Sequence, residues 1–297
     1  MKPFLKFLLV IFAILFLSVF LAPWLYTFLP YKFERIFNRL VMIFSLAAVF
    51  LFVRVKKSWL AGLGLAWSGK KSRREIAAGF LTGFLLLAIF LALKVFFKQA
   101  VWAPAAMNPA ALGLQAAGAL FAAFLIALIE EFFFRGFVFN TLHAHWRWPL
   151  LLSLAATNLF YALTHFVTFY KPLVDKTPSW IDSLRLIGAP FMALGGIRQF
   201  WPEAAGLLIF GMILSRAALT ARSLFPAIGL HAGCVFFVKL DGVFFDFPER
   251  VNRLLFASGK FYDGVVGWLF LGLIGWMLEQ RLRQASAAGI AEEKGKI

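Results

Sequence analysis

The chain has a single cysteine, Cys234, among its 297 residues. One thiol excludes an intrachain disulfide framework and any metal cluster held by several cysteines. Charged residues are also scarce: they make up 15% of the sequence, whereas 62% is hydrophobic and 38 positions are phenylalanine. A soluble domain of this length does not need so much apolar surface, so the composition predicts a polytopic membrane protein.

Acidic residues are few as well, 14 against 30 basic ones, which leaves a net charge of +16. The basic residues interrupt apolar runs instead of forming one stripe, so we expect no nucleic-acid partner. The positive-inside rule and anionic lipid headgroups account for them better. Lys2 and Lys6 precede an apolar run at 7–31 that is too long for a signal-peptide core, which predicts an uncleaved first span. The expected location is an integral, multi-pass position in a membrane, the inner or plasma membrane in a bacterium.

Hydropathy predicts an all-α polytopic membrane helix bundle of about eight transmembrane helices, each roughly 20 residues long. The expected spans are 7–29, 36–54, 76–97, 110–142, 149–170, 203–221, 224–240 and 262–279. The mixed segment from Lys171 to Pro202 reads as an interfacial or re-entrant loop, or as a lid. The tail from Arg281 is charged and rich in small residues, which predicts disorder.

Three charges stand inside one of the longest apolar runs, at Glu130, Glu131 and Arg135. A charged side chain at mid-bilayer costs roughly 2.5–3.5 kcal/mol, so these side chains must face a protein interior or a water-filled cavity. A helix end at headgroup level is the structural alternative. Apolar sequence resumes directly at Gly136, which favours a site over a helix end.

Of the four histidines, His165 and His231 each lie within an apolar segment. Arg147, Trp148 and Pro149 mark a turn, with Glu131 17 residues before Trp148 and His165 17 residues after it. Two α-helical arms would bring Glu131 and His165 to the same depth, about 25 Å from the turn. We therefore expect a shared site of buried acids and histidines.

Helical phase assigns different roles to the two glutamates. Residues i and i+4 share a helix face, so Glu131 and Arg135 are the expected ion pair, and Glu130 is left less compensated. We expect Glu130 to activate water as a general base, while Glu131 and Arg135 orient it and balance charge. His165 would hold the water or protonate the leaving group, and His231 would stabilise an oxyanion.

These residues, in this order, resemble the CAAX prenyl protease and bacteriocin-processing (CPBP, ABI) family of intramembrane glutamic proteases. The first motif, Glu-Glu-x-x-x-Arg, is matched by Glu130, Glu131 and Arg135; the second, an aromatic residue four before a histidine, by Tyr161 and His165. The third is a histidine after a Pro-Ala-Ile-Gly-Leu approach, matched at 226–231 and ending at His231.

The resemblance covers roughly 110–240 and implies an eight-helix bundle in which a glutamate-activated water attacks a peptide bond. It divides the chain into N-terminal helices (1–100), a catalytic core (101–242), a last loop and helix (243–280) and a charged tail (281–297). The implied partner is a membrane-associated protein or peptide substrate within the bilayer, and the expected mechanism needs no cofactor.

The chain departs from the third motif, because Val235 occupies the position where the family has asparagine. Valine has no donor for an oxyanion. Asn158, seven residues before His165, is a possible substitute, although a hydrogen bond to a neighbouring helix is the simpler reading.

Three alternatives remain at this stage. Glu130, His165 and His231 could hold zinc as a two-histidine, one-carboxylate set. A non-catalytic member of the family, binding a peptide or giving bacteriocin immunity, would explain Val235. A proton-coupled transporter using the buried acids lacks support from any internal repeat.

Overall fold

The computed structural model describes residues 2–53, 64–166, 177–195, 197–247, 253–256 and 260–294. Almost all of this described part is helical, which confirms the all-α prediction. The chain divides into two compact units, one formed by Met1–Trp59 with Ala162–Phe200 and the other by Leu60–Tyr161 with Trp201–Ile297. The functional division predicted from the motifs follows other boundaries and stays a prediction.

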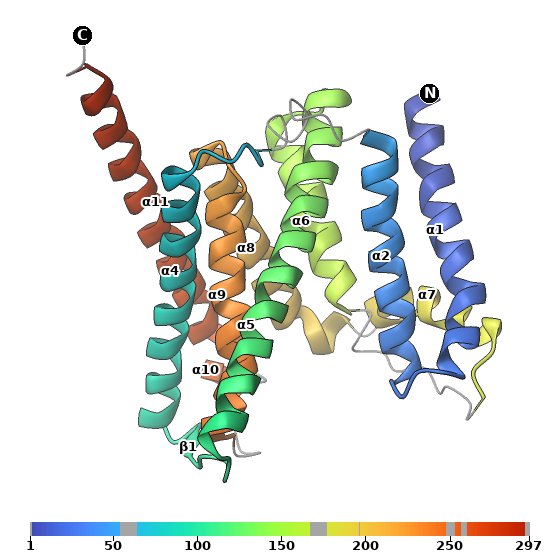
Figure 1. Cartoon of the computed structure of the whole chain (residues 1–297), viewed down its shortest axis with the longest axis horizontal. Coiled ribbons are helices and arrows are strands. Elements are labelled where there is room, and N and C mark those ends of the chain that lie inside the picture. Colours follow the sequence, from blue (N-terminus) through green and yellow to red (C-terminus); the bar gives the residue numbers. More distant parts are fainter. Residues whose placement is uncertain are drawn as a thin grey trace. The chain divides into compact units, whose positions relative to one another are not determined.

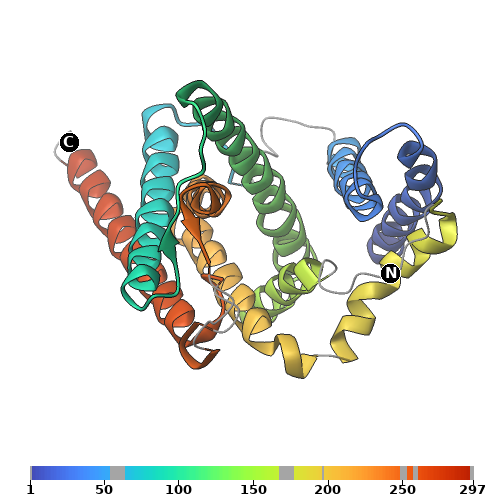
Figure 2. The same cartoon turned by 90° about the horizontal axis from the view of Figure 1, so that it is seen from below.

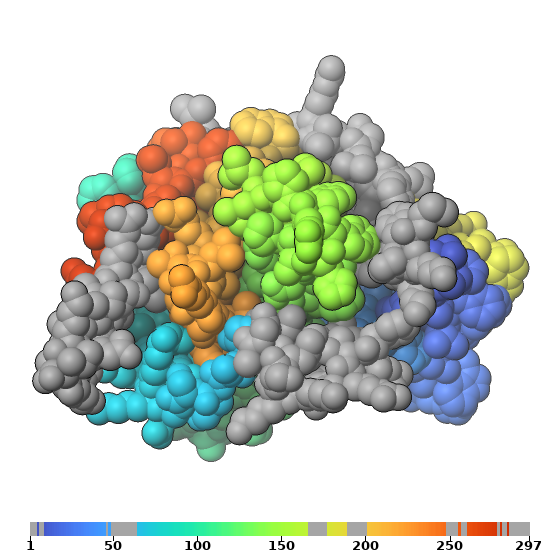
Figure 3. Space-filling model, turned by 90° about the horizontal axis from the view of Figure 1, so that it is seen from above, coloured from blue at the N-terminus to red at the C-terminus, as the bar shows by residue number. Residues whose placement is uncertain are grey.

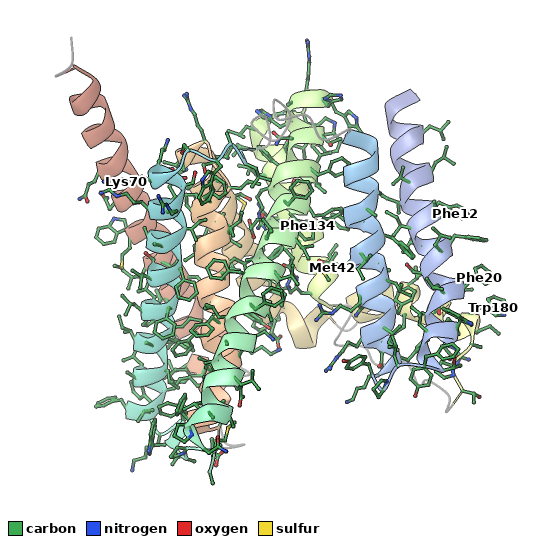
Figure 4. The ribbon with its side chains drawn as sticks, in the orientation of Figure 1. Phe12, Phe20, Met42, Lys70, Phe134 and Trp180 are labelled. Carbon is green, nitrogen blue, oxygen red and sulfur yellow. The ribbon has the colours of Figure 1, made fainter. Side chains whose placement is uncertain are left out.

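Among its described residues, the first unit contains α1 (Lys2–Tyr26), α2 (Phe33–Val53) and α7 (Trp180–Gly195), labelled in Figure 1. Its core is made of Val19 and Ala22 from α1, Phe33 and Phe37 from α2, and Leu186 from α7, among others. On the outside of α1, the ring of Phe20 stacks against Trp180 at the start of α7, with centroids 6.5 Å apart (Figure 4). These contacts hold α7 against α1.

The second unit contains the remaining elements. They are α4 (Lys70–Phe96), β1 (Val101–Trp102), α5 (Pro109–Glu131), η1 (Phe132–Phe139), η2 (Thr141–His145), most of α6 (Leu150–Phe166) and α8 (Ile197–Ala221), α9 (Phe225–Phe244), β2 (Phe245–Asp246), α10 (Arg253–Phe256) and α11 (Gly264–Lys294). The two strands pair antiparallel, with Val101 opposite Asp246 and Trp102 opposite Phe245, and so tie the start of α5 to the end of α9 (Figure 2).

Each of the eight expected spans overlaps a helix in its described residues, while residue 54 and residues 167–170 lie outside them. Five stretches are long and apolar enough to cross a membrane: Leu9–Tyr26, Lys70–Phe96, Pro109–His145, Trp201–Ala221 and Phe225–Phe244. Two shorter apolar helices, Leu150–His165 and Gly264–Met277, add to them. The protein is therefore an integral, multi-pass membrane protein. The count of eight stays a prediction, since three of the expected spans are not among these five.

Two expectations about irregular segments are wrong for the residues described. Between Lys171 and Pro202, α7 and the start of α8 are helical where a loop or lid was expected. The tail expected to be disordered continues α11 as helix to Lys294. Its sequence includes four alanines, two arginines and two glutamates, which are good helix formers, so the helix of the last span extends beyond its apolar part.

Glycines set the close approach of α4 and α9, which lie side by side in Figure 1. A Cβ on Gly229 would meet the backbone carbonyl of Ile76, and one on Gly233 would meet that of Phe80. From the other side, a Cβ on Gly83 would meet the carbonyl of Leu230. Small residues of this kind let membrane helices pack backbone to backbone. This contact fixes the depth of α9 within the unit.

The start of α7 is a capping box. Asp182 Oδ2 accepts hydrogen bonds from the backbone N of Ser179 at 2.8 Å and from its Oγ at 3.0 Å. Arg185 Nη1 donates to Asp182 Oδ1 at 3.0 Å. The Ser179 backbone N–H, helped by the serine hydroxyl and by Arg185, lowers the pKa of Asp182. The box explains why this polar segment begins a helix.

Removing this carboxylate is expected to destabilise α7 at neutral pH only. Because the pKa of Asp182 is lowered by folding, its stabilisation is complete above the ordinary value of 3.8 and is lost as the pH falls through the lowered value. Asp182→Ala should therefore cost about 0.5–2 kcal/mol at pH 7. Thermal unfolding of both proteins at pH 7 and at pH 2 measures this: the difference in Tm should close in acid, and an equal difference at both pH values contradicts it.

Candidate active site

The two acids of the first motif end α5. Asn108 fixes the start of this helix, because its Oδ1 accepts a hydrogen bond from the backbone N of Ala111 at 2.7 Å and Pro109 follows it. From Phe132 the chain continues as the π-helices η1 and η2. Turns of this wider kind occur frequently at functional sites. Here they follow directly after Glu130 and Glu131.

Glu131 is the centre of a buried polar cluster. Its side chain is 0% exposed, and its Oε1 accepts hydrogen bonds from Arg135 Nη1 at 3.2 Å and from His231 Nδ1 at 2.8 Å. The expected Glu131–Arg135 ion pair is therefore present. Donation from His231 to this carboxylate requires the tautomer with a proton on Nδ1. Glu131 joins α5 to α9 through this bond.

Arg135 is equally buried, and it holds α5, α6 and α8 together. Its Nη2 donates to the carbonyl of Gly211 at 2.9 Å and to Asn158 Oδ1 at 3.1 Å. Its Nε donates to Ser215 Oγ at 3.4 Å, and this hydroxyl also donates to Asn158 Oδ1 at 3.1 Å. The guanidinium carbon lies 4.5 Å from the centre of the Tyr161 ring. The charge is thus satisfied by hydrogen bonds and a cation–π contact.

His231 brings the second acid into the same cluster. Its ring is 4% exposed and packs edge-on against Tyr161 and Phe210. With Nδ1 bound to Glu131, the opposite nitrogen, Nε2, faces Glu130, whose Oε2 lies 3.9 Å away. The Glu130 side chain is 23% exposed, whereas those of Glu131, Arg135 and His231 are nearly inaccessible. Glu130 is therefore the member of this cluster that solvent reaches most easily.

Residues 112–237 match the family model described as Type II CAAX prenyl endopeptidase Rce1-like. Over this segment the chain is similar to the Rce1-like CAAX endopeptidase family. The matched range contains Glu130, Glu131, Arg135 and His231, so the predicted resemblance is confirmed. The match supports a membrane endopeptidase at the level of the family. No curated protein and no solved structure gives a significant match.

The second-motif histidine of this family, His165, lies in the last turn of α6. His165 belongs to the first compact unit, whereas the cluster around Glu131 belongs to the second. The depth argument that paired it with Glu131 assumed two α-helical arms. That assumption is wrong for the first arm, because η1 and η2 are π-helical between Glu131 and the turn. A role for His165 stays a prediction.

The sequence did not identify two partners of Arg135. Gly211 and Ser215 stand four residues apart on α8 and face the guanidinium. A Cβ on Gly211 would lie 2.7 Å from Asn158 Oδ1, so a side chain here would displace the amide. The sequence did contain a signal for these partners, because a glycine and a serine at i and i+4 in an apolar helix indicate a polar contact with another helix.

Val235 occupies the position expected for the third-motif asparagine, and Asn158 is the candidate substitute for it. The carbonyl oxygen of Asn158 is occupied by Arg135 and Ser215, and its Nδ2 donates to Leu154 O at 2.9 Å. The reading of Asn158 as an interhelical hydrogen-bonding residue is thus confirmed. Val235 packs against the hydrophobic core of the unit.

No group of three or more histidine, cysteine, aspartate or glutamate side chains is arranged to hold a metal among the described residues. In the second unit, the cluster offers one free imidazole nitrogen, on His231, and the carboxylate of Glu130. Catalytic zinc sites generally use three protein ligands. The set in this unit is one ligand short, and the zinc alternative would depend on His165.

Proposed function

We propose that the protein hydrolyses a peptide bond in a membrane-associated protein or peptide, with a water activated by Glu130. The observation that carries this is the gap of 3.9 Å between Glu130 Oε2 and His231 Nε2. Such a separation is too long for a hydrogen bond and suits one bridging water. The Glu130 side chain is the most exposed of the cluster, at 23%, while its Oε2, which faces His231, is buried.

In the proposed reaction, Glu130 removes a proton from the water as its oxygen attacks the carbonyl carbon. The carbonyl π electrons move to the oxygen and form a tetrahedral oxyanion. Collapse of this intermediate breaks the C–N bond, and the proton taken by Glu130 passes to the leaving amine. Atoms and charge balance, and each product terminus is an ordinary carboxylate or amine.

Three other residues have supporting roles in this proposal. Glu131 holds Nδ1 of His231, so that Nε2 stays turned toward the reacting carbonyl. In the imidazolium form, which carries a proton on Nε2 as well, His231 donates a hydrogen bond to the oxyanion. Arg135 supplies the cationic partner of the buried Glu131 carboxylate. His231 would then supply the donor that Val235 cannot, and His165 is expected to assist from the end of α6.

Peptide termini in cells provide the test of this function. We expect cells expressing the wild-type chain to show new N-termini in membrane-associated peptides, and Glu130→Gln to remove them. A general base contributes about 100- to 10,000-fold, so residual cleavage should fall at least 100-fold. Asp246→Asn, which removes an exposed carboxylate in β2, is the matched control and should leave the profile unchanged.

Each alternative predicts a different result. A peptide-binding or immunity protein would show no new N-termini and would keep its phenotype in Glu130→Gln. A zinc enzyme would lose cleavage on treatment with a chelator and regain it with added zinc. A transporter would carry protons into liposomes in a manner that Glu130→Gln removes.

A further inference from the structure

A cavity lies in the first unit, formed by residues between 25 and 43, outside the segment 112–237 that matches the family. It has a volume of about 430 Å³, within the range of roughly 300–1,000 Å³ typical of ligand pockets. Its walls come from the end of α1, the α1–α2 turn and the first three turns of α2. Leu25, Leu29 and Ile43 form an apolar part, and Tyr31, Arg35 and Arg39 form a polar one.

The positive charges of Arg35 and Arg39 stand at positions where the local electrostatics are unfavourable. Arg35 lies in the first turn of α2, where the helix dipole disfavours cations, and Arg39 follows at i+4, where like charges repel. Neither guanidinium has a hydrogen-bond or ion-pair partner among the residues that the structure describes. Both side chains are exposed. An anion between them would relieve each of these costs.

The position of the cavity along the membrane normal indicates which anions can reach it. The membrane-spanning stretch of α1 is Leu9–Tyr26, so the cavity begins where that stretch ends. Trp24 and Tyr31 are 59% and 53% exposed there, as in the aromatic belts found at headgroup level. Arg35 stands at this level, and Ile43 lies two turns deeper, about 12 Å along α2. The polar part therefore faces the phosphate layer and the apolar part the acyl chains.

We propose that this cavity binds an anionic glycerophospholipid, with the headgroup phosphate between Arg35 and Arg39 and an acyl chain along Leu40 and Ile43. Basic cavities between membrane helices recognise lipid headgroups in this way. Occupation would also link α1 to α2 beside their shared core of Val19, Phe33 and Phe37. The site does not involve Glu130 and is independent of the proposed peptidase activity.

Native mass spectrometry of the full-length protein tests the proposal. The protein is exchanged into bilayers containing equal amounts of phosphatidylglycerol and phosphatidylcholine with matched acyl chains, and the lipids retained on the protein are counted. We expect wild type to retain phosphatidylglycerol preferentially. Each basic residue near a membrane surface contributes about fivefold, so Arg35→Gln with Arg39→Gln should reduce this preference roughly 30-fold.

Two further variants make the test specific. Lys32→Gln removes a neighbouring exposed charge that does not line the cavity, and it should leave the preference nearly unchanged. Ile43→Trp fills the apolar part from an exposed position and should reduce retention of both lipids while both arginines remain. Equal retention of the two lipids by wild type would overturn the proposal. So would full competition by inorganic phosphate, or equal effects of Lys32→Gln and the arginine pair.

Discussion

Replacing Arg135 by methionine is expected to remove most of the stability of the second unit together with its activity. The methionine fills the volume but leaves Glu131, which is 0% exposed, without its cationic partner. Breaking a buried ion pair by removing one member costs about 3–5 kcal/mol, because the remaining charge stays buried and unpaired. The carbonyl of Gly211 and the amide of Asn158 lose a donor as well.

Thermal unfolding and protease resistance of the purified variant in bilayers measure this loss. Arg222→Met is the matched control. Arg135 and Arg222 both line a cavity of about 280 Å³, but the Arg222 side chain is exposed. The connection between α8 and α9 that carries Arg222 lies at the surface, beside the green segment that contains η2 and the start of α6, in Figure 3. A surface change of this kind should stay within about 0.5 kcal/mol.

A double variant separates charge burial from catalysis. Adding Glu131→Gln to Arg135→Met removes the unpaired charge, so part of the lost stability should return. Activity should not return, because His231 then loses the carboxylate that orients it. A double variant as unstable as Arg135→Met alone would show that the pairing with Glu131 is not the source of the loss. Wild-type stability of Arg135→Met would contradict the argument as a whole.

The polar cluster around Glu131 and Arg135 shows which contacts can be predicted from the sequence alone. The Glu131–Arg135 pair was predictable, since both residues lie on one stretch of helix and their spacing is local. The bonds from Arg135 to Gly211 and Ser215 were not, because they depend on how α5 and α8 are rotated and shifted against each other. Asn158 could be assigned to a helix contact but not to a partner for the same reason.

The backbone after Glu131 was harder to predict than the charges. Apolar periodicity indicates a helix over 110–142 but does not distinguish α-helical from π-helical turns, which differ by one residue in hydrogen-bond spacing. The depth expected for His165 depended on that difference. The motif order nevertheless identified the acids and His231 as neighbours, because family motifs reflect contacts that span the fold.

Substituting alanine at Gly229 and Gly233 together is expected to separate α9 from α4. Each new Cβ would meet a backbone carbonyl of α4, and a backbone cannot move aside as a flexible side chain can. Overpacking of this kind costs about 1–3 kcal/mol at each position. His231 lies between the two glycines, so its bond to Glu131 should be lost along with stability.

Gly242→Ala on the same helix is the control, because nothing lies within 4 Å of a Cβ at that position. Alanine there should be neutral or stabilise the helix by up to about 1 kcal/mol. Unfolding midpoints of both proteins, together with crosslinking between cysteines introduced on α4 and α9, report stability and helix separation. If the double alanine variant kept both its midpoint and its crosslinks, α4 and α9 would not pack through these glycines. The depth at which α9 presents His231 to Glu130 would then have to be set by other contacts, foremost the bond between His231 and Glu131.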